Sequence, residues 1–366
     1  MRSASLIGAS FLWFLDAMEI ELKREKLHFK IPARTSRGEY TEHEMLIVKL
    51  SGNGRSGIGE CAPLPDLSCD RDAYKDLNEV HSLLKDAFAF NGSCQAHSDS
   101  ALHEAIYEKL HNYPALLFAV ESALAEMNQS PELYDTDFAR GMEGIPINGL
   151  VWMADHGTML RQMEEKIAAG YRCIKLKIGA IKWEEEMSLI RSIRSRFTEN
   201  ELQLRVDANG AFSVEEATEK LDELSQYRIH SIEQPVRQGQ WEEMARLCRT
   251  SKVPVALDEE LIGINTVEEK ERMLEAVKPQ YIVVKPTLHG GMTGTREWIE
   301  MARKRGIRSW ITSALESNIG LKNVALLAAS VYSGKWELPQ GLGTGLLFTS
   351  NFETGVHIRD GHIWIS

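Results

Sequence analysis

The chain has 366 residues, of which 43% are hydrophobic and 26% charged, and its formal net charge is −11. This length suffices for a (β/α)₈ barrel of about 250 residues together with a smaller domain. The acidic charge and the lack of basic runs exclude a nucleic-acid-binding protein, and no apolar stretch reaches the roughly 20 residues of a membrane-spanning helix. Five cysteines without metal-ligand spacing favour a cytoplasmic protein with free thiols.

Residues 1–17 are predicted to be an N-terminal extension. The stretch from Ser5 to Leu15 is apolar, as in a signal-peptide core, but Asp16 interrupts its end and no small-residue cleavage site follows. A second methionine, Met18, directly precedes a strand pattern. The pattern favours an upstream start or a cloning extension over a secretion signal.

Residues 18–143 are predicted to form a separate α+β domain. A β-hairpin over residues 18–50 surrounds a long polar loop at 32–40, and a third strand follows at 56–61. From residue 72 to 127 the spacing of the apolar residues becomes helical. Long polar loops often carry function, so we expect the loop at 32–40 to face a binding site.

From residue 144 to 345 the sequence repeats an apolar strand followed by an amphipathic helix. A single charged residue closes each of five short apolar runs, at intervals of 25 to 30 residues: Lys177, Asp207, Glu233, Asp258 and Lys285. A strand, a helix and their two loops need about that length, so the repeat predicts the βα units of a barrel. The carboxyl ends of barrel strands meet at one mouth, where barrel enzymes keep their chemistry.

Strand parity turns these charges toward the barrel interior. In the run 204–207, Leu204 and Val206 share one face, which suits the helices outside, and Arg205 and Asp207 share the other. Inward charges are costly unless they are paired or bound to a metal. Carboxylates are the hard oxygen ligands that Mg²⁺ prefers, and a lysine beside them is a candidate base. The sequence therefore predicts a divalent-metal, proton-transfer site.

These motifs resemble the enolase superfamily, in its muconate-cycloisomerase-like subgroup. The resemblance rests on Lys175-Leu176-Lys177, Asp207-Ala208-Asn209-Gly210, Glu233-Gln234-Pro235, Asp258-Glu259-Glu260 and Lys285-Pro286. It covers the chain from about Met18 to the end. It implies a modified TIM barrel at 144–345, an N-terminal capping domain at 18–143, and a C-terminal segment at 346–366 that returns to the capping domain.

The resemblance also implies a role for each charged residue. Asp207, Glu233 and Asp258 would hold Mg²⁺, or Mn²⁺ in its place, which binds the substrate carboxylate and stabilises the enediolate formed on loss of the α-proton. Lys177 would be the base that removes this proton and then the acid that helps hydroxide leave. Lys285 would stabilise the anion from the opposite side of the site.

Further contacts follow from the same resemblance. Lys175 would contact the substrate carboxylate beside Lys177. Asn209 would bind substrate and, together with Glu259, orient the metal ligands. Ser313 and Glu316, ahead of a predicted helix, would receive a distal carboxylate of the substrate.

Within the subgroup, residues 313–320 and 339–345 most resemble the o-succinylbenzoate synthases. The implied reaction is dehydration of 2-succinyl-6-hydroxy-2,4-cyclohexadiene-1-carboxylate in menaquinone biosynthesis, and the expected partner is this small-molecule dicarboxylate. Residues 338–343 lack the Asp-x-Asp that dipeptide epimerases use for an ammonium group. Two opposed lysines would equally serve an N-acylamino acid racemase or a dipeptide epimerase, which remain the alternative. The sequence leaves open whether the chain forms a homo-oligomer.

Overall fold

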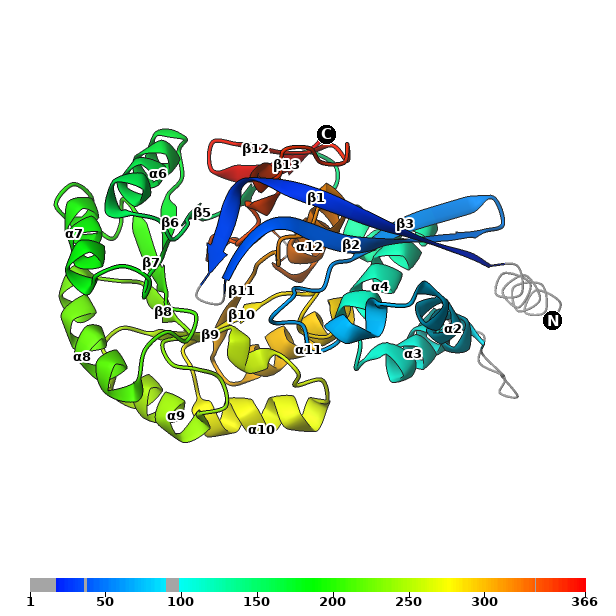
Figure 1. Ribbon diagram of the computed structural model, residues 1–366. Helices are drawn as coiled ribbons and strands as arrows, with labels where there is room; N and C mark the ends of the chain where they lie inside the picture. Colours follow the sequence, from blue (N-terminus) through cyan, green and yellow to red (C-terminus); the bar gives the residue numbers. More distant parts are fainter. Residues whose placement is uncertain (1–17, 36–37, 90–98, 333) are drawn as a thin grey trace.

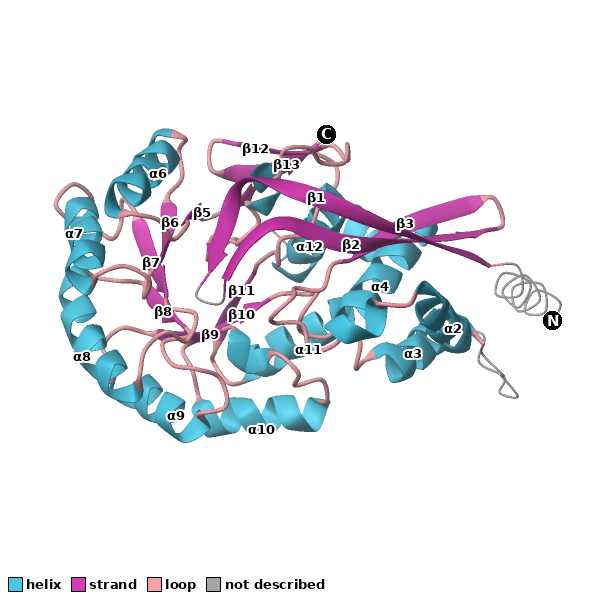
Figure 2. Cartoon of the chain, viewed as in Figure 1, coloured by secondary structure: helices cyan, strands magenta, loops and turns pink. Residues whose placement is uncertain are grey.

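The computed structural model describes residues 18–35, 38–89, 99–332 and 334–366, so the predicted extension at 1–17 lies outside the described residues. A barrel of parallel strands lies beside an antiparallel sheet with its own helices (Figure 1; Figure 2). This confirms the predicted barrel with an N-terminal α+β domain. None of the helices in these ranges combines the length and apolarity needed to cross a membrane.

The N-terminal part is a three-stranded antiparallel sheet in the order β1-β2-β3, followed by helices. Its elements are β1 (Glu19–Thr35), β2 (Gly38–Gly52), β3 (Arg55–Cys61), η1 (Arg71–Tyr74), α2 (Leu77–Phe88), α3 (Asp99–Leu110), α4 (Pro114–Asn128) and α5 (Pro131–Tyr134). The loop expected at 32–40 is wrong, because β1 continues through Thr35 and β2 begins at Gly38. Strand pairing persists through these polar residues after a register shift between His28 and Ala33, since a two-stranded ribbon needs no apolar face at its tip.

Strand β3 lies directly on helix α4, and two glycines make this approach necessary. A Cβ atom on Gly57 would stand 1.9 Å from the carbonyl oxygen of Ala123, and one on Gly59 would stand 1.8 Å from that of Ala119. Both distances are far inside van der Waals contact, so only glycine permits the packing. The two glycines of β3 are thus explained by the close approach of strand and helix.

The barrel strands run parallel in the order β5-β6-β7-β8-β9-β10-β11. They are β5 (Gly149–Val151), β6 (Cys173–Lys177), β7 (Gln203–Asp207), β8 (Ser231–Glu233), β9 (Val255–Leu257), β10 (Tyr281–Val284) and β11 (Arg308–Ile311). Residues 340–341 close the ring. The N–H of Gln340 donates to Pro146 O at 2.8 Å on one side, and that of Gly341 donates to Ile311 O at 2.8 Å on the other.

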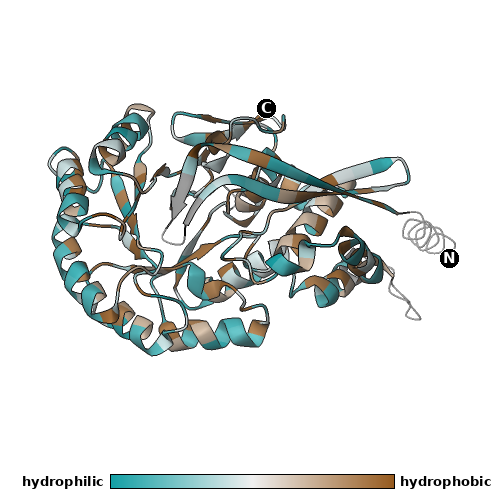
Figure 3. Ribbon diagram, in the orientation of Figure 1, coloured by the Kyte–Doolittle hydropathy of each residue, from teal (hydrophilic) through white to brown (hydrophobic). Residues whose placement is uncertain are grey.

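Helices follow the strands and cover the outside of the barrel. They are α6 (His156–Ala168), α7 (Trp183–Arg194), α8 (Val214–Leu224) with η2 (Ser225–Tyr227), α9 (Trp241–Thr250), α10 (Val267–Val277), α11 (Gly291–Lys304) and α12 (Asn318–Tyr332). The short η3 (Glu259–Leu261) instead lies at the strand end after β9. Hydrophobic residues dominate the barrel strands, whereas the outer helices carry both kinds (Figure 3). Leu204 and Val206 lie in the core under the helices, and the Arg205 guanidinium lies 4.0 Å from the Trp310 ring, as strand parity predicts.

The C-terminal segment contacts both parts of the molecule. After η4 (Thr344–Leu347), Phe348 stacks on Phe29 of β1 with ring centroids 4.7 Å apart. The hairpin of β12 (Val356–Arg359) and β13 (His362–Ile365) then pairs with β4 (Ile145–Pro146), at the entry to the barrel. The segment therefore connects the sheet of the N-terminal part with β4, where the barrel begins.

Two carboxylates of the N-terminal part cap barrel helices. Glu60 of β3 accepts hydrogen bonds from Ser317 N and Gly320 N, both 2.8 Å, and from the Ser317 hydroxyl, at the start of α12. Burial raises the pKa of Glu60 to about 7, despite these hydrogen bonds, which favour its ionised form. Glu121 of α4 accepts from Met292 N at 2.5 Å and from Thr293 N at 3.2 Å, at the start of α11. Helix N-termini favour negative charge, so these contacts fix the two parts against each other.

We expect Glu121→Ala to lower the free energy of unfolding by about 2–4 kcal/mol, because a cap is lost and buried N–H donors are left unpaired. Glu121 is only 4% exposed. Urea denaturation measures the change. Glu132→Ala is the matched control, since Glu132 also contacts α11, through Arg296 at 2.8 Å, but its side chain is 66% exposed. That variant should cost under about 1 kcal/mol. Equal effects of the two changes would contradict the capping role.

Candidate active site

The register of the barrel sheet brings the charged strand ends together. Lys177 lies beside Asp207, and Asp207 beside Glu233, on the neighbouring strands β6, β7 and β8. Asp258 directly follows β9, and Lys285 directly follows β10. The five charges therefore meet at one end of the barrel because each closes a parallel strand.

Asp207 and Glu233 form ion pairs with lysines of β6. The Lys175 Nζ lies 2.6 Å from Glu233 Oε1 and 2.9 Å from Asp207 Oδ2. The Lys177 Nζ donates to Asp207 Oδ2 at 2.7 Å and to Asn209 Oδ1 at 2.6 Å. Lys177 is thus oriented by one carboxylate and one amide, which aim its amine at a fixed point.

Further contacts involve the residues that follow β9 and β10. Lys285 pairs with Asp258, and the Asn209 Nδ2 donates to Glu259 Oε1 at 2.9 Å. In the strand order of the sheet, three strands (β7, β8 and β9) separate β6 from β10. In a ring closed by residues 340–341, Lys177 and Lys285 therefore stand on opposite walls.

Burial makes the charges of this site strongly interdependent. Burial raises the pKa of Glu233, and the negative charge of Asp207 raises it further, to about 8. Burial alone would also raise the pKa of Asp207, but Lys175 and Lys177 outweigh it and lower that pKa below the usual range. Burial lowers the pKa of Lys175, yet Asp207 and Glu233 raise it more, so this lysine is charged. Without a cation the cluster therefore keeps Glu233 neutral at neutral pH.

The donor set fits a divalent cation in its chemistry. Asp207, Glu233 and Asp258 offer hard oxygen ligands, and each is at most 2% exposed. Asp258 Oδ1 is buried and meets no hydrogen-bond partner among the described residues. Within the same ranges, no three acidic, histidine or cysteine side chains gather closely enough to hold a metal, and each carboxylate pairs with a lysine instead.

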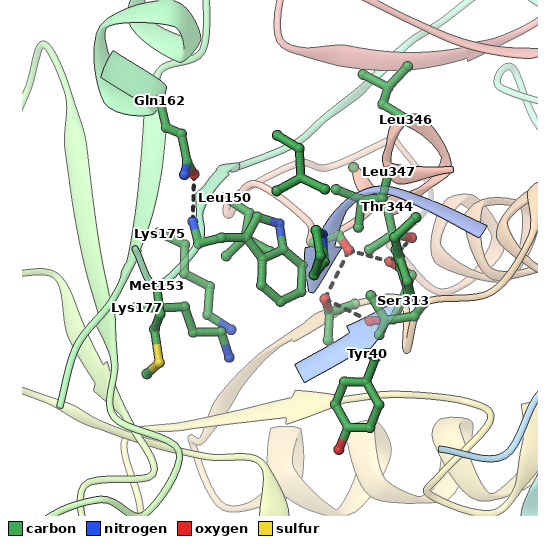
Figure 4. A pocket seen from close by; sticks show the side chains of 18 of the residues that line it. Tyr40, Leu150, Met153, Gln162, Lys175, Lys177, Ser313, Thr344, Leu346 and Leu347 are labelled. Carbon is green, nitrogen blue, oxygen red and sulfur yellow. Dashed lines mark hydrogen bonds between the residues drawn. The ribbon is translucent and has the colours of Figure 1, made fainter. Parts of the chain in front are cut away.

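A cavity of about 680 Å³ opens above these charges, between the barrel mouth and the N-terminal sheet. Lys175 and Lys177 project into it from one wall, and Ser313 and Thr344 lie on the opposite wall (Figure 4). The Ser313 Oγ lies 2.8 Å from Thr344 Oγ1. Other residues that line the same space include Asn209, Glu259, Lys285, Ala314 and Leu315.

Glu316 does not line the cavity. It is fully buried and accepts hydrogen bonds from Ala314 N at 2.6 Å and from Thr287 Oγ1 at 2.5 Å. These contacts hold the loop that carries Ser313, and Leu315 in the same loop has φ +69°, a conformation that side chains rarely adopt. Strained residues of this kind concentrate at binding sites, where the surroundings enforce them.

The sequence analysis missed four cavity residues: His43, Leu64, Trp152 and Thr344. Tyr40 also lines the cavity, and it belongs to the segment at 32–40 that was expected to face a binding site. Trp152 directly follows β5. The search for charged residues at strand ends passed over it because Trp152 is apolar. The Tyr40 hydroxyl donates to Asp66 Oδ2 at 2.5 Å and joins the hairpin of β1 and β2 to the loop after β3. No periodicity in the sequence reports that contact, because it joins β2 to a loop 26 residues further along the chain.

A family model described as enolase C-terminal domain-like matches residues 158–366. The barrel, with charges at successive strand ends, agrees with that match. The chain therefore belongs to the enolase C-terminal domain-like family.

Among its relatives, the o-succinylbenzoate synthase of Desulfotalea psychrophila is 41% identical over 96% of this chain and 100% of its own length. The crystal structure of MenC from the same organism has a TM-score of 0.77, with 39% identity over 95% of this chain and 100% of that one. A dipeptide epimerase from Cytophaga hutchinsonii, solved with Mg and a dipeptide, has the same fold, with a TM-score of 0.77 at 20% identity over 95% of this chain and 93% of that one.

Proposed function

We propose that this chain is an o-succinylbenzoate synthase, a lyase that dehydrates 2-succinyl-6-hydroxy-2,4-cyclohexadiene-1-carboxylate in menaquinone biosynthesis in the cytoplasm. The single observation that carries the proposal is the 41% identity to an o-succinylbenzoate synthase over the full length of that relative. The cavity supports it, because lysines on one wall and hydroxyl groups on the other suit a substrate with two carboxylates.

The metal site is part of the proposal. Asp207, Glu233 and Asp258 would hold Mg²⁺, with Mn²⁺ as a substitute. When bound, the cation acts as a Lewis acid that stabilises negative charge on the substrate carboxylate. Asn209 and Glu259, which share a hydrogen bond of 2.9 Å, would orient the carboxylates that bind the metal.

The lysines would move the proton. Lys177 would take it from the carbon that bears the ring carboxylate. The bond from the neighbouring carbon to its hydroxyl would then break as Lys177 returns the proton to the departing hydroxide, so one water leaves and the ring becomes aromatic. Lys175 would bind the ring carboxylate, and Lys285 would stabilise the developing anion by its charge.

The second carboxylate would be bound at the opposite wall. Ser313 and Thr344 place two hydroxyl groups 2.8 Å apart there. Glu316, which accepts from Ala314 N, would hold the backbone of this loop in place while Ser313 contacts the ligand. This refines the substrate-binding role expected for Glu316 into one of positioning.

Racemisation of N-acylamino acids or epimerisation of dipeptides is the second candidate. The observation in its favour is that Lys177 and Lys285 stand on opposite walls, where one could remove a proton and the other return it. The missing Asp-x-Asp at 338–343 disfavours substrates with a free ammonium group.

Purified enzyme with Mg²⁺ should convert the cyclohexadiene substrate to o-succinylbenzoate with kcat/KM of roughly 10⁴–10⁸ M⁻¹s⁻¹. Mass spectrometry would detect the loss of one water. A parallel assay should measure loss of optical rotation with N-succinylamino acids and with dipeptides. A silent dehydration assay beside rapid racemisation would replace the synthase with the isomerase.

A further inference from the structure

One histidine in the cavity wall has no role in the chemistry proposed above. His43 lies on β2, opposite Leu27 of β1, and its side chain is 3% exposed. It nevertheless lines the cavity. A polar ring at this depth needs hydrogen-bond partners, since buried polar groups in native proteins almost always have them.

The Nε2 atom of His43 lacks such a partner. It is buried and forms no hydrogen bond with any residue that the structure describes. Burial lowers the pKa of His43 to about 4, so the imidazole is neutral at neutral pH and carries one N–H donor. An unpaired buried nitrogen at the wall of a binding cavity indicates a partner supplied by the ligand.

The position of His43 indicates which end of the ligand it meets. His43 shares its face of the hairpin with Leu27 and Met45, because cross-strand partners and alternate residues point the same way. Leu27 and Met45 belong to a cluster that also contains Trp152 after β5, Leu315 after β11, and Leu347 and Phe348 at the end of η4. Ser313 and Thr344 lie on that same side of the barrel, across the cavity from Lys175 and Lys177.

We propose that His43 binds the succinyl chain of the substrate, donating a hydrogen bond from Nε2–H to one of its oxygens. The inference rests on the proposed function, in which the ring carboxylate binds among the lysines and the chain extends to the opposite wall. The oxygens of that chain, a ketone and a carboxylate, are acceptors only, so the hydrogen resides on Nε2. The N-terminal domain thereby contributes a polar contact to substrate specificity.

Calorimetric titration of the Mg²⁺-loaded protein tests this contact, with o-succinylbenzoate and benzoate as the two probes. They share the ring carboxylate, but only the first has the succinyl chain. His43→Leu should weaken o-succinylbenzoate binding by ~10- to 100-fold, the effect of one hydrogen bond to a charged or strongly polar acceptor. Benzoate affinity should stay unchanged. Met45→Leu, a change at a buried apolar residue on the same face, should affect neither ligand.

A second pair of variants separates the hydrogen bond from packing. The amide nitrogen of glutamine reaches the place of Nε2, whereas that of asparagine reaches only the place of Nδ1. His43→Gln should therefore retain o-succinylbenzoate affinity within ~3-fold, and His43→Asn should lose it as His43→Leu does. Equal losses for both ligands, or equal affinities of the Gln and Asn variants, would overturn the proposal.

The same variants distinguish this inference from the proposed function. If the wild-type enzyme fails to dehydrate the cyclohexadiene, the synthase assignment fails on that assay alone. N-succinyl-amino acids also carry a succinyl chain, so their binding to wild type and His43→Leu still reports on His43. A loss confined to succinylated ligands supports the contact under either activity.

Discussion

Lys177→Ala is expected to remove most of the catalytic activity, lowering kcat by ~10²- to 10⁴-fold, the usual contribution of a positioned general base. The amine of Lys177 is held by Asp207 Oδ2 at 2.7 Å and Asn209 Oδ1 at 2.6 Å, inside the cavity. Steady-state kinetics with saturating substrate and Mg²⁺ measures the change in kcat.

The control for this variant is Lys182→Ala, which removes an exposed lysine five residues further along the chain. Its kcat should equal that of wild type. Circular dichroism and Mg²⁺ titration should show that Lys177→Ala keeps its fold and binds the cation. Near-normal turnover by Lys177→Ala would transfer the role of base to Lys175 or Lys285.

The barrel helices were predictable because their signals are local. Ser213 with Glu216, and Thr266 with Glu269, form reciprocal capping boxes at the starts of α8 and α10. Such pairs act within one turn of chain, so the sequence shows them directly. The strand ends were predictable for a similar reason, since a parallel sheet repeats one geometry at each strand.

What the sequence could not indicate depends on contacts across long separations. The hydrogen bond of Tyr40 with Asp66 and the cap of Glu121 on α11 join segments that share no periodicity. Glu316 is a second residue whose contacts the sequence could not indicate. It was expected to bind substrate, but its hydrogen bonds with Ala314 and Thr287 hold the carboxylate out of the cavity lining. The direction of a loop side chain is decided by its partners rather than by its position in the chain.

Removal of the metal is expected to abolish activity, and Mg²⁺ or Mn²⁺ should restore it. The physical reason is the charge balance of the buried site, in which Glu233, with its pKa raised to about 8, is neutral at neutral pH unless a cation binds. Four carboxylates (Asp207, Glu233, Asp258 and Glu259) share the strand ends with three lysines (Lys175, Lys177 and Lys285). A dication with the two negative charges of the substrate would leave that balance unchanged, whereas substrate alone would make it worse. Activity is measured after treatment with EDTA and gel filtration, then after readdition of each cation.

Stability gives a second measurement of the metal that does not depend on turnover. Mg²⁺ at about 100 times its Kd should stabilise the wild-type protein by about 2.7 kcal/mol, because it binds only the folded state. Glu233→Gln should lose this stabilisation together with activity. Without metal the same variant should be about as stable as wild type at neutral pH, since Glu233, with its pKa raised to about 8, is already neutral there. Thermal melting with and without Mg²⁺ compares the two proteins. Full turnover by metal-free wild type, or an undiminished Mg²⁺ effect in Glu233→Gln, would contradict the assignment of Glu233 as a ligand.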